Sequence, residues 1–242
     1  MNERQEYIKK RFEGEKISIT ERQAQQFEQY YELLTETNKV MNLTAVTKFE
    51  EVVCRHFLDS VLVTNYFDFS AIRNFIDVGT GAGFPGIPIK ILYPHLSVTL
   101  LDSLGKRMAF LSKVVDNLGL NGEGAGVELL HGRAEDFGRD PDYRGRYDLC
   151  LSRAVANLST LSEYCTPFLK IGGRFVSYKS REIEEELETA KPAIKKLGCK
   201  TRAVEKFTLD GAGRSLIFIE RKAGLSAKYP RKAGIPAKAP LT

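Results

Sequence analysis

The 242-residue sequence predicts an α/β fold in which helices cover both faces of a mostly parallel, seven-stranded sheet. From residue 74 onward, short apolar runs alternate with stretches of helical periodicity, which is the pattern of parallel strands joined by helices. Towards the end of this region, two strand-like segments flank the short turn at 210–213. A turn this short joins only antiparallel neighbours, so we expect the sheet to end in a hairpin.

Residues 1–70 are expected to form a helical extension that precedes the sheet. Thr20 and Gln23 have capping-box spacing, and apolar side chains follow them at helical intervals. Thr47 and Glu50 repeat this spacing before a second predicted helix. The buried face of that helix is expected to hold Val52, Val53, Phe57, Ser60 and Val61.

The alternating elements occupy residues 71–222, which we expect to form a Rossmann-like domain. The predicted strands are 75–78, 98–101, 127–130, 147–151, 174–178, 199–209 and 215–220. The predicted helices are 84–93, 104–118, 157–169 and 182–196. Open sheets of this kind bind ligands at the carboxyl edge of their strands, so this edge is where we expect the site.

Composition indicates an ordinary globular protein of the cytoplasm, with 43% hydrophobic and 28% charged residues. No apolar run reaches the roughly 18 residues that cross a membrane, and the N-terminus lacks the apolar segment of a secretory signal. The four cysteines and three histidines are scattered without metal-ligand spacing. We therefore predict buried, reduced thiols, no metal site and no membrane partner.

The positive charge is concentrated at the C-terminus. The six basic residues after position 220, with no acidic residue among them, are Arg221, Lys222, Lys228, Arg231, Lys232 and Lys238. Subtracting them from 36 basic residues leaves 30, against 31 acidic ones. We therefore predict that a basic tail, 223–242, helps to hold nucleic acid. The candidate substrate contacts here are Arg221, Lys222, Arg231 and Lys232. A solubilising end, or a strap packed through Tyr229, Ile235 and Leu241, remains open.

The clearest local feature is the glycine-rich segment 77–86, DVGTGAGFPG, which follows a predicted strand and opens a predicted helix. This context is typical of a nucleotide-type cofactor, because glycine permits a sharp turn and a close approach of backbone to ligand. Gly81, Gly83 and Gly86 also have the spacing of a dinucleotide fingerprint.

Two features of this segment favour S-adenosylmethionine over a dinucleotide. Pro85 and Pro88 remove backbone donors from the start of the helix, where a diphosphate would bind. Asp77 would place negative charge beside a diphosphate, whereas S-adenosylmethionine has no phosphate and carries two cationic groups. Asp77, Gly81 and Gly83 are therefore candidate cofactor contacts.

Further candidates follow the other parallel strands. Asp102 ends the second strand, where an acid accepts hydrogen bonds from ribose hydroxyls. Glu135, beside Ala134 after the third strand, would frame an adenine, although a helix cap explains it equally well. Arg153 and Lys179 follow the fourth and fifth strands. Such residues are rarely buried without partners, so we expect them to contact cofactor or substrate.

These residues resemble those of the RsmG family, formerly called glucose-inhibited division protein B. The motifs that carry the likeness are DVGTGAGFPGIPIKI, RHFLDS, GRAED, LSRAVA, YKS and the ending YPRKAGIPAKAPL. The resemblance implies a class I methyltransferase fold. It also implies methyl transfer from S-adenosylmethionine to guanine N7 in a conserved loop of 16S rRNA, a component of the small ribosomal subunit. The cofactor pocket would be lined by Gly79, Phe84, Ala134, Glu135 and Arg153. We expect a monomer.

Guanine N7 carries a free lone pair in the neutral base, so we predict positioning without a catalytic acid or base. His56, on or beside the face of the second helix, is either a core histidine or a substrate contact. Three other functions remain open. They are a small-molecule methyltransferase, a noncatalytic RNA-binding assembly factor, and an NAD-linked oxidoreductase, which Pro85 and Asp77 disfavour.

Overall fold

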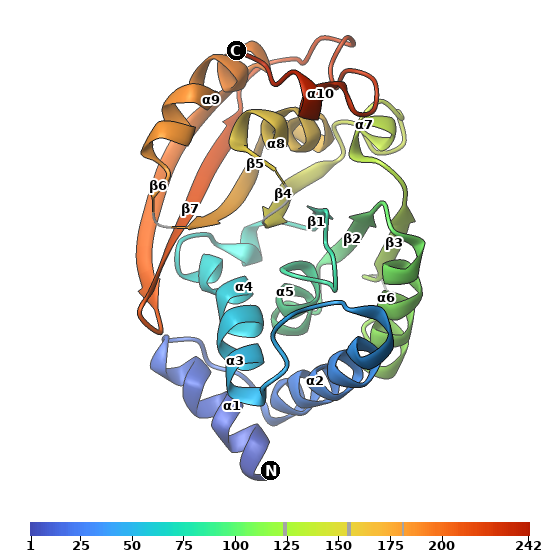
Figure 1. The fold of residues 1–242 in the computed structure, drawn as a ribbon, viewed down its shortest axis with the longest axis vertical. Helices are drawn as coiled ribbons and strands as arrows, with labels where there is room; N and C mark the ends of the chain where they lie inside the picture. The colour runs from blue at the N-terminus through green and yellow to red at the C-terminus, as the bar shows by residue number, and fades with distance from the viewer. Residues whose placement is uncertain (123–124, 154–155, 181) are drawn as a thin grey trace.

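The computed structural model describes residues 1–122, 125–153, 156–180 and 182–242 and contains a seven-stranded sheet of order β3-β2-β1-β4-β5-β7-β6 (Figure 1). The strands are β1 (Asn74–Val78), β2 (Ser97–Asp102), β3 (Val127–His131), β4 (Tyr147–Arg153), β5 (Leu169–Ser180), β6 (Cys199–Leu209) and β7 (Ala212–Arg221). β1 to β5 pair in parallel, whereas β7 runs antiparallel to both β5 and β6. The predicted parallel sheet with a terminal antiparallel hairpin is confirmed.

Helices cover both faces of this sheet (Figure 1). One face carries α1 (Glu3–Gly14), α2 (Glu21–Met41), α5 (Gly86–Leu92) and α6 (Gly105–Asn117), and the other carries α7 (Ala134–Phe137), α8 (Leu158–Cys165) and α9 (Glu184–Lys196). Phe75 and Ile76 are neighbours in β1 but belong to different apolar clusters, since successive strand side chains point to opposite faces. Both faces are buried, which explains the continuous apolar runs of the central strands.

The N-terminal helices are capped only partly as predicted. The backbone N–H of Gln23 donates to Thr20 Oγ1 at 3.2 Å, and that of Thr20 donates to Gln23 Oε1 at 2.8 Å, which confirms the first capping box. The second box, at Thr47 and Glu50, is wrong. The helix α3 (Phe49–Val52) begins after Lys48, which makes no side-chain cap. It continues through the π-helical turn Val53–Leu58 into α4 (Asp59–Val61).

The N-terminal helices are packed into the main core. The five residues predicted for the inner face of the second helix are all fully buried. Tyr30, also fully buried in α2, stacks on Phe57 and Phe84 with ring centroids 5.4 and 5.3 Å away. Its hydroxyl donates to the carbonyl of Ala82 in the glycine-rich segment. The first helices therefore support the loop that follows β1.

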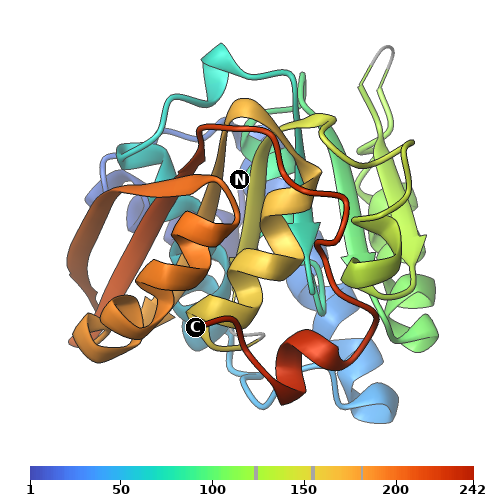
Figure 2. The ribbon, with the colours of Figure 1, turned by 90° about the horizontal axis from the view of Figure 1, so that it is seen from above.

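The C-terminal segment 223–242, which includes α10 (Ile235–Lys238), lies along α8 on the outside of the sheet (Figure 2). Tyr229 and Leu241 are buried against the cluster of that face, whereas Ile235 is 41% exposed. The segment is thus a packed strap and not an extended arm, and two of its three proposed anchors hold it in place.

Two basic residues expected to contact nucleic acid are engaged within the protein instead. Arg221 is 8% exposed and donates to the carbonyls of Leu169 and Ala223. Arg231 is paired with Glu163, which is fully buried. Composition cannot reveal Leu169 and Glu163 as partners, because they come from distant parts of the chain. The other two candidates, Lys222 and Lys232, are exposed, and Lys222 Nζ donates to Glu220 Oε1 at 2.6 Å.

The cysteines are dispersed through the core. All four are buried and unpaired, as predicted. Within the described ranges, no cluster of three or more His, Cys, Asp or Glu side chains is placed to hold a metal ion. No helix in these ranges has the length and apolar character needed to cross a membrane.

We expect Tyr30→Phe to lower the free energy of unfolding by about 1–2 kcal/mol, because the buried Ala82 carbonyl loses its donor. Urea unfolding measures this loss. Tyr31→Phe is the matched control: it removes an exposed hydroxyl, 3.2 Å from the Thr47 carbonyl, and should cost less than about 0.5 kcal/mol. Equal losses in the two variants would contradict the support assigned to Tyr30.

Candidate active site

The glycine-rich loop between β1 and α5 is a folded element tied to the next strand. The backbone N–H groups of Gly79 and Thr80 donate to the carbonyl of Leu101 at 2.8 and 3.1 Å. Gly81 has a φ of +63° and Gly83 a φ of +99°, in the left-handed region that favours glycine. The loop therefore needs glycine to follow this path beside β2.

Asp77 closes this loop from beneath. Its Oδ2 accepts hydrogen bonds from the Thr80 hydroxyl at 2.7 Å and from the Gly86 N–H at 2.9 Å. The side chain is fully buried, and burial raises its pKa to about 7. The expectation that Asp77 faces a cofactor is corrected here. Alternation along β1 places its side chain on the same face as Phe75, under α5.

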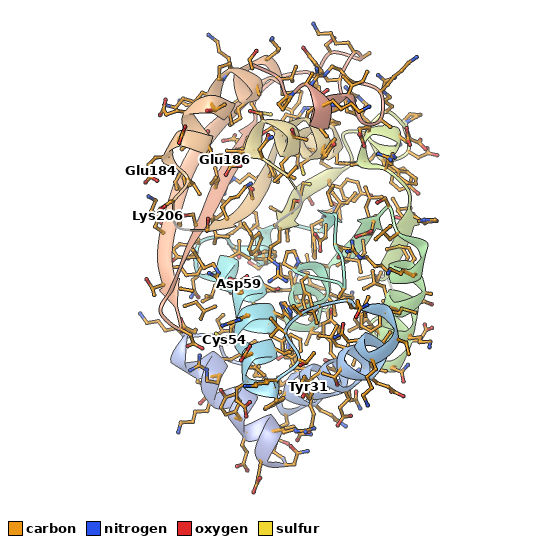
Figure 3. The ribbon with its side chains drawn as sticks, viewed as in Figure 1. Tyr31, Cys54, Asp59, Glu184, Glu186 and Lys206 are labelled. Atoms are coloured by element: carbon orange, nitrogen blue, oxygen red, sulfur yellow. The ribbon has the colours of Figure 1, made fainter. Side chains whose placement is uncertain are left out.

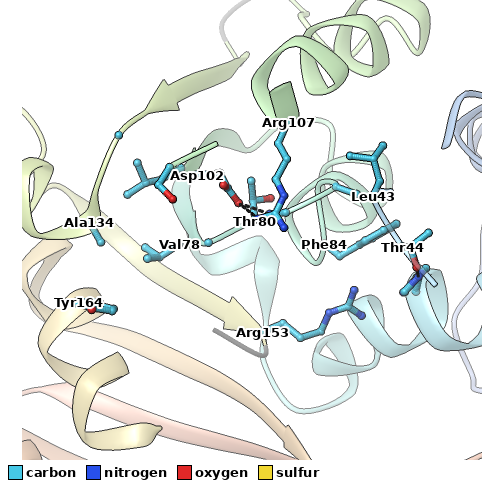
Figure 4. A pocket seen from close by; sticks show the side chains of 17 residues that line it. Leu43, Thr44, Val78, Thr80, Phe84, Asp102, Arg107, Ala134, Arg153 and Tyr164 are labelled. Atoms are coloured by element: carbon cyan, nitrogen blue, oxygen red, sulfur yellow. Dashed lines mark hydrogen bonds and ion pairs between the residues drawn. The ribbon is translucent and has the colours of Figure 1, made fainter. Parts of the chain in front are cut away.

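A cavity of about 430 Å³ opens above the loop, at the carboxyl edge of the sheet (Figure 4). This volume lies in the range of small-molecule sites. Six of the predicted cofactor residues line it: Gly79, Gly81, Phe84, Asp102, Ala134 and Arg153. The sequence did not indicate several others, namely Leu43, Thr44, Arg107 and Tyr164.

Asp102 joins the loop to the start of α6. Its Oδ2 accepts from the Gly81 N–H and from Arg107 Nη1, each at 2.9 Å, and its Oδ1 accepts from the Leu104 N–H at 3.0 Å. The carboxylate is 3% exposed, so its charge is held at the cavity wall by fixed donors. Arg107 lies five residues after Asp102, in the first turn of α6. The sequence could therefore have indicated it as a partner of this acid.

Two further predicted cofactor residues lie behind the cavity and do not line it. A Cβ at Gly83 would come within 2.6 Å of the Tyr30 hydroxyl, so this glycine serves packing against α2. Glu135 is 3% exposed, and its Oε1 accepts from the Gly234 N–H at 2.8 Å. Its neighbour Ala134 is the one that reaches the cavity.

His56 and Arg153 flank Phe84 in the cavity wall. The His56 ring stacks on Phe84 with centroids 4.6 Å apart, and the Arg153 guanidinium lies 5.1 Å from the Phe84 centroid. Nε2 of His56 is 2.8 Å from Thr44 Oγ1. Burial, and then the charge of Arg153, lower the pKa of His56 to about 4. The imidazole is therefore neutral near pH 7.

A second cavity, of about 540 Å³, adjoins the first and shares His56 and Arg153 with it. Asp59 lies where the N-terminal helices approach β4 and β5 (Figure 3). Its carboxylate accepts from Arg153 Nη1 at 2.9 Å and from Arg214 Nε at 2.7 Å. The helix α4 and the strands β4 and β7 thus meet at one buried acid. Because two arginines surround this single acid, the wall of the second cavity carries positive charge.

Lys179 also lines the second cavity, but its ammonium group already has partners. Its Nζ donates to Glu186 Oε1 and to the Ala156 carbonyl, both at 2.7 Å. The ammonium group that we expected to contact cofactor or substrate is therefore already paired within the protein. Residues 154 and 155, in the segment after β4 that we expected at the site, lie outside the described residues.

Residues 23–216 match the family model described as rRNA small subunit methyltransferase G. The chain belongs to this family. A ribosomal RNA small subunit methyltransferase G of Brevibacillus brevis is 49% identical over 227 residues, covering 93% of this chain and 94% of that one. Another, from an Exiguobacterium species, is 45% identical over 243 residues and covers both chains completely.

Solved structures share the fold at low identity. The O-methyltransferase from Bacillus cereus in complex with SAH has a TM-score of 0.56 and 14% identity, covering 80% of this chain and 91% of its own. TrmN from Thermus thermophilus has a TM-score of 0.51 and 18% identity, covering 70% and 53%. Family and fold together confirm the predicted S-adenosylmethionine-dependent methyltransferase of class I architecture.

We expect His56 to make the protein less stable as the pH falls. Its folded-state pKa of about 4 lies below the usual 6.5, so its stabilising effect is complete above pH 6.5 and is lost as the pH falls towards 4. The loss amounts to about 3 kcal/mol at most. Urea unfolding of the unaltered protein and of His56→Gln, at several pH values, measures it. The difference between the two should shrink at low pH; a constant difference would contradict the assigned pKa.

Gly81→Ala should weaken cofactor binding while the protein stays folded. A Cβ at Gly81 meets no protein atom within 4 Å, so it projects into the cavity that this residue lines. Alanine tolerates the φ of +63° at a cost of about 1–2 kcal/mol, whereas a β-branched valine strains the loop itself. Calorimetry with S-adenosylhomocysteine measures affinity, and circular dichroism checks the fold. Unchanged affinity in a folded variant would place the cofactor elsewhere.

Proposed function

We propose that this chain transfers a methyl group from S-adenosylmethionine to N7 of a guanine in 16S rRNA of the small ribosomal subunit. The observation that carries this proposal is the pair of cavities that meet at His56 and Arg153. The cavity over the glycine-rich loop would take the cofactor, and the positive cavity beside it would take the base. Membership of the rRNA small subunit methyltransferase G family supports rRNA as the substrate.

The start of α5 supports S-adenosylmethionine and argues against a diphosphate. The Gly86 N–H is bonded to Asp77, the Ile87 N–H to the Gly83 carbonyl at 2.8 Å, and Pro85 and Pro88 have no N–H. The donors that a diphosphate would need are thus already in use. The residues that would hold the cofactor are Gly79, Gly81, Asp102 and Ala134, and the bound cofactor supplies a methyl group activated on a sulfonium. The cavity volume and the clear space above Gly81 fit this group.

The groups where the two cavities meet suit an acceptor that needs no deprotonation. The neutral His56 has its Nε2 on Thr44, and Asp59 is held by two arginines. Attack by the N7 lone pair forms the C–N bond while the C–S pair stays on sulfur, so positive charge moves to the base and no proton is exchanged. Arg153 and Arg214 would orient the base or its phosphate, since guanidinium groups donate to guanine O6 and to phosphate oxygens.

The partner would then be rRNA, either free or within the small ribosomal subunit. We propose that the protein acts on it as a monomer in the cytoplasm. The exposed Lys232 of the tail would contact phosphates, and so would the neighbouring Lys222 if it exchanged its ion pair with Glu220. Arg55, 59% exposed at the rim of the second cavity and 3.6 Å from Glu51, would offer a third cation. A small-molecule acceptor or a noncatalytic role in assembly are the alternatives that an activity assay separates.

We expect the purified protein to methylate guanine N7 in 16S rRNA, presented as naked RNA, isolated small subunits or whole ribosomes. Mass spectrometry of digested RNA locates the methyl group and ranks the three substrates. Transfer to small-molecule acceptors alone would support the first alternative. Cofactor binding without transfer to any substrate would support the second.

Activity should vary less than about threefold between pH 6.5 and 8.5, because N7 needs no deprotonation. The pKa of the buried Asp77, about 7, falls within this range, although its side chain lines neither cavity. Asp77→Asn is therefore the control that removes its titration from the pH profile. A tenfold rise per pH unit that persists in Asp77→Asn would indicate a catalytic base and another acceptor atom.

A further inference from the structure

Residues 223–242, here called the C-terminal strap, are held to the body by polar contacts as well as apolar ones. Arg139 Nε and Arg144 Nη1 donate to the carbonyls of Pro230 and Tyr229, each at 2.7 Å. The Thr160 hydroxyl donates to the Pro236 carbonyl at 3.1 Å. These contacts reach both α8 and the segment after α7, so the strap has a defined position over the two helices (Figure 2).

One anchor of the strap joins Arg231 to Glu163 of α8. Glu163 is fully buried, and its carboxylate accepts from the Arg231 backbone N–H at 2.8 Å, from Nε at 2.9 Å and from Nη2 at 2.6 Å. These hydrogen bonds raise the pKa of Arg231. A buried carboxylate without this partner would be strongly unfavourable, so the ion pair holds the strap in one place. The next residue of α8, Tyr164, lines the cofactor cavity.

A second anchor joins Gly234 to Glu135 of α7. The Gly234 N–H donates to Glu135 Oε1 at 2.8 Å, and Glu135 is 3% exposed. The residue before it, Ala134, lines the cofactor cavity. Helices α7 and α8 also contact each other, so the two cavity residues lie on neighbouring elements. The strap thus binds Glu135 beside the cavity residue of α7, and Glu163 beside the cavity residue of α8.

We infer that the C-terminal strap is a positioning element of the cofactor site, which sets Ala134 and Tyr164 through Arg231 and Gly234. This inference rests on the proposed function, because it takes the cavity over the glycine-rich loop as the cofactor site. According to this inference, Arg231 contributes to the affinity for the cofactor and not to RNA binding. Arg231 and Gly234 touch neither cavity, so they act through Glu163 and Glu135.

The test compares Arg231→Met with Lys232→Met, which removes the same charge from an exposed neighbour. Calorimetry with S-adenosylhomocysteine should give a Kd roughly tenfold higher for Arg231→Met and unchanged for Lys232→Met. In assays with 16S rRNA, Arg231→Met should raise the KM for S-adenosylmethionine, while kcat at saturation and the KM for RNA stay unchanged. An equal Kd in all three proteins, or a rise confined to the KM for RNA, overturns the inference.

Arg231→Met leaves Glu163 charged and buried, so lower stability alone could weaken binding. The double variant Arg231→Met/Glu163→Gln removes that charge and should recover the Tm, because replacing a whole buried pair is far less unfavourable than breaking it. We expect the Kd of the double variant to stay raised, since the anchor is still missing. A Kd that recovers together with the Tm would reduce the anchor to a stability contact and overturn the inference.

Binding by the unaltered protein separates this inference from the proposed function. If the unaltered protein binds S-adenosylhomocysteine and Arg231→Met binds it equally well, only the positioning role of the strap fails. If the unaltered protein does not bind it, the proposed cofactor site fails and the inference fails with it.

Discussion

The buried Asp77 carboxylate is the contact on which the site depends. It gathers the hydroxyl of Thr80 and the N–H of Gly86, so it closes the loop after β1 and fixes where α5 begins. Once the loop is closed, its backbone presents Gly79 and Gly81 to the cavity, and no donor at the start of the helix is left for a diphosphate. One acid that never reaches the ligand thereby shapes the site and narrows the choice of cofactor.

The N-terminal helices support the loop, and helices on the opposite face complete the cavity. Tyr30 of α2 holds the carbonyl of Ala82, and His56 stacks on Phe84 from the side of the N-terminal helices. On the opposite face, α7 and α8 carry Ala134 and Tyr164 to the cavity under the C-terminal segment. The sheet and the segments that follow its strands supply most of the wall, and the N-terminal helical extension adds Leu43, Thr44 and His56.

The strands and helices were predictable because burial of both sheet faces produces apolar runs that the sequence displays directly. The failed capping box at Thr47 shows that spacing alone does not select which residue starts a helix. Asp77 was misplaced because its role was argued from charge, although alternation with Phe75 already placed it on the face under α5. The partnership of Arg231 with Glu163 was not predictable, since 68 residues separate them and no local pattern connects them.

Asp59 receives an arginine from β4 and another from β7, so one carboxylate of the N-terminal helices is satisfied only when residue 214 is in place. During synthesis this acid is made long before its second partner. A chain released early keeps the glycine-rich loop but has an incomplete wall beside it. The ribosome must therefore translate at least as far as residue 214 before the protein that is proposed to modify ribosomal RNA has a finished wall beside the loop.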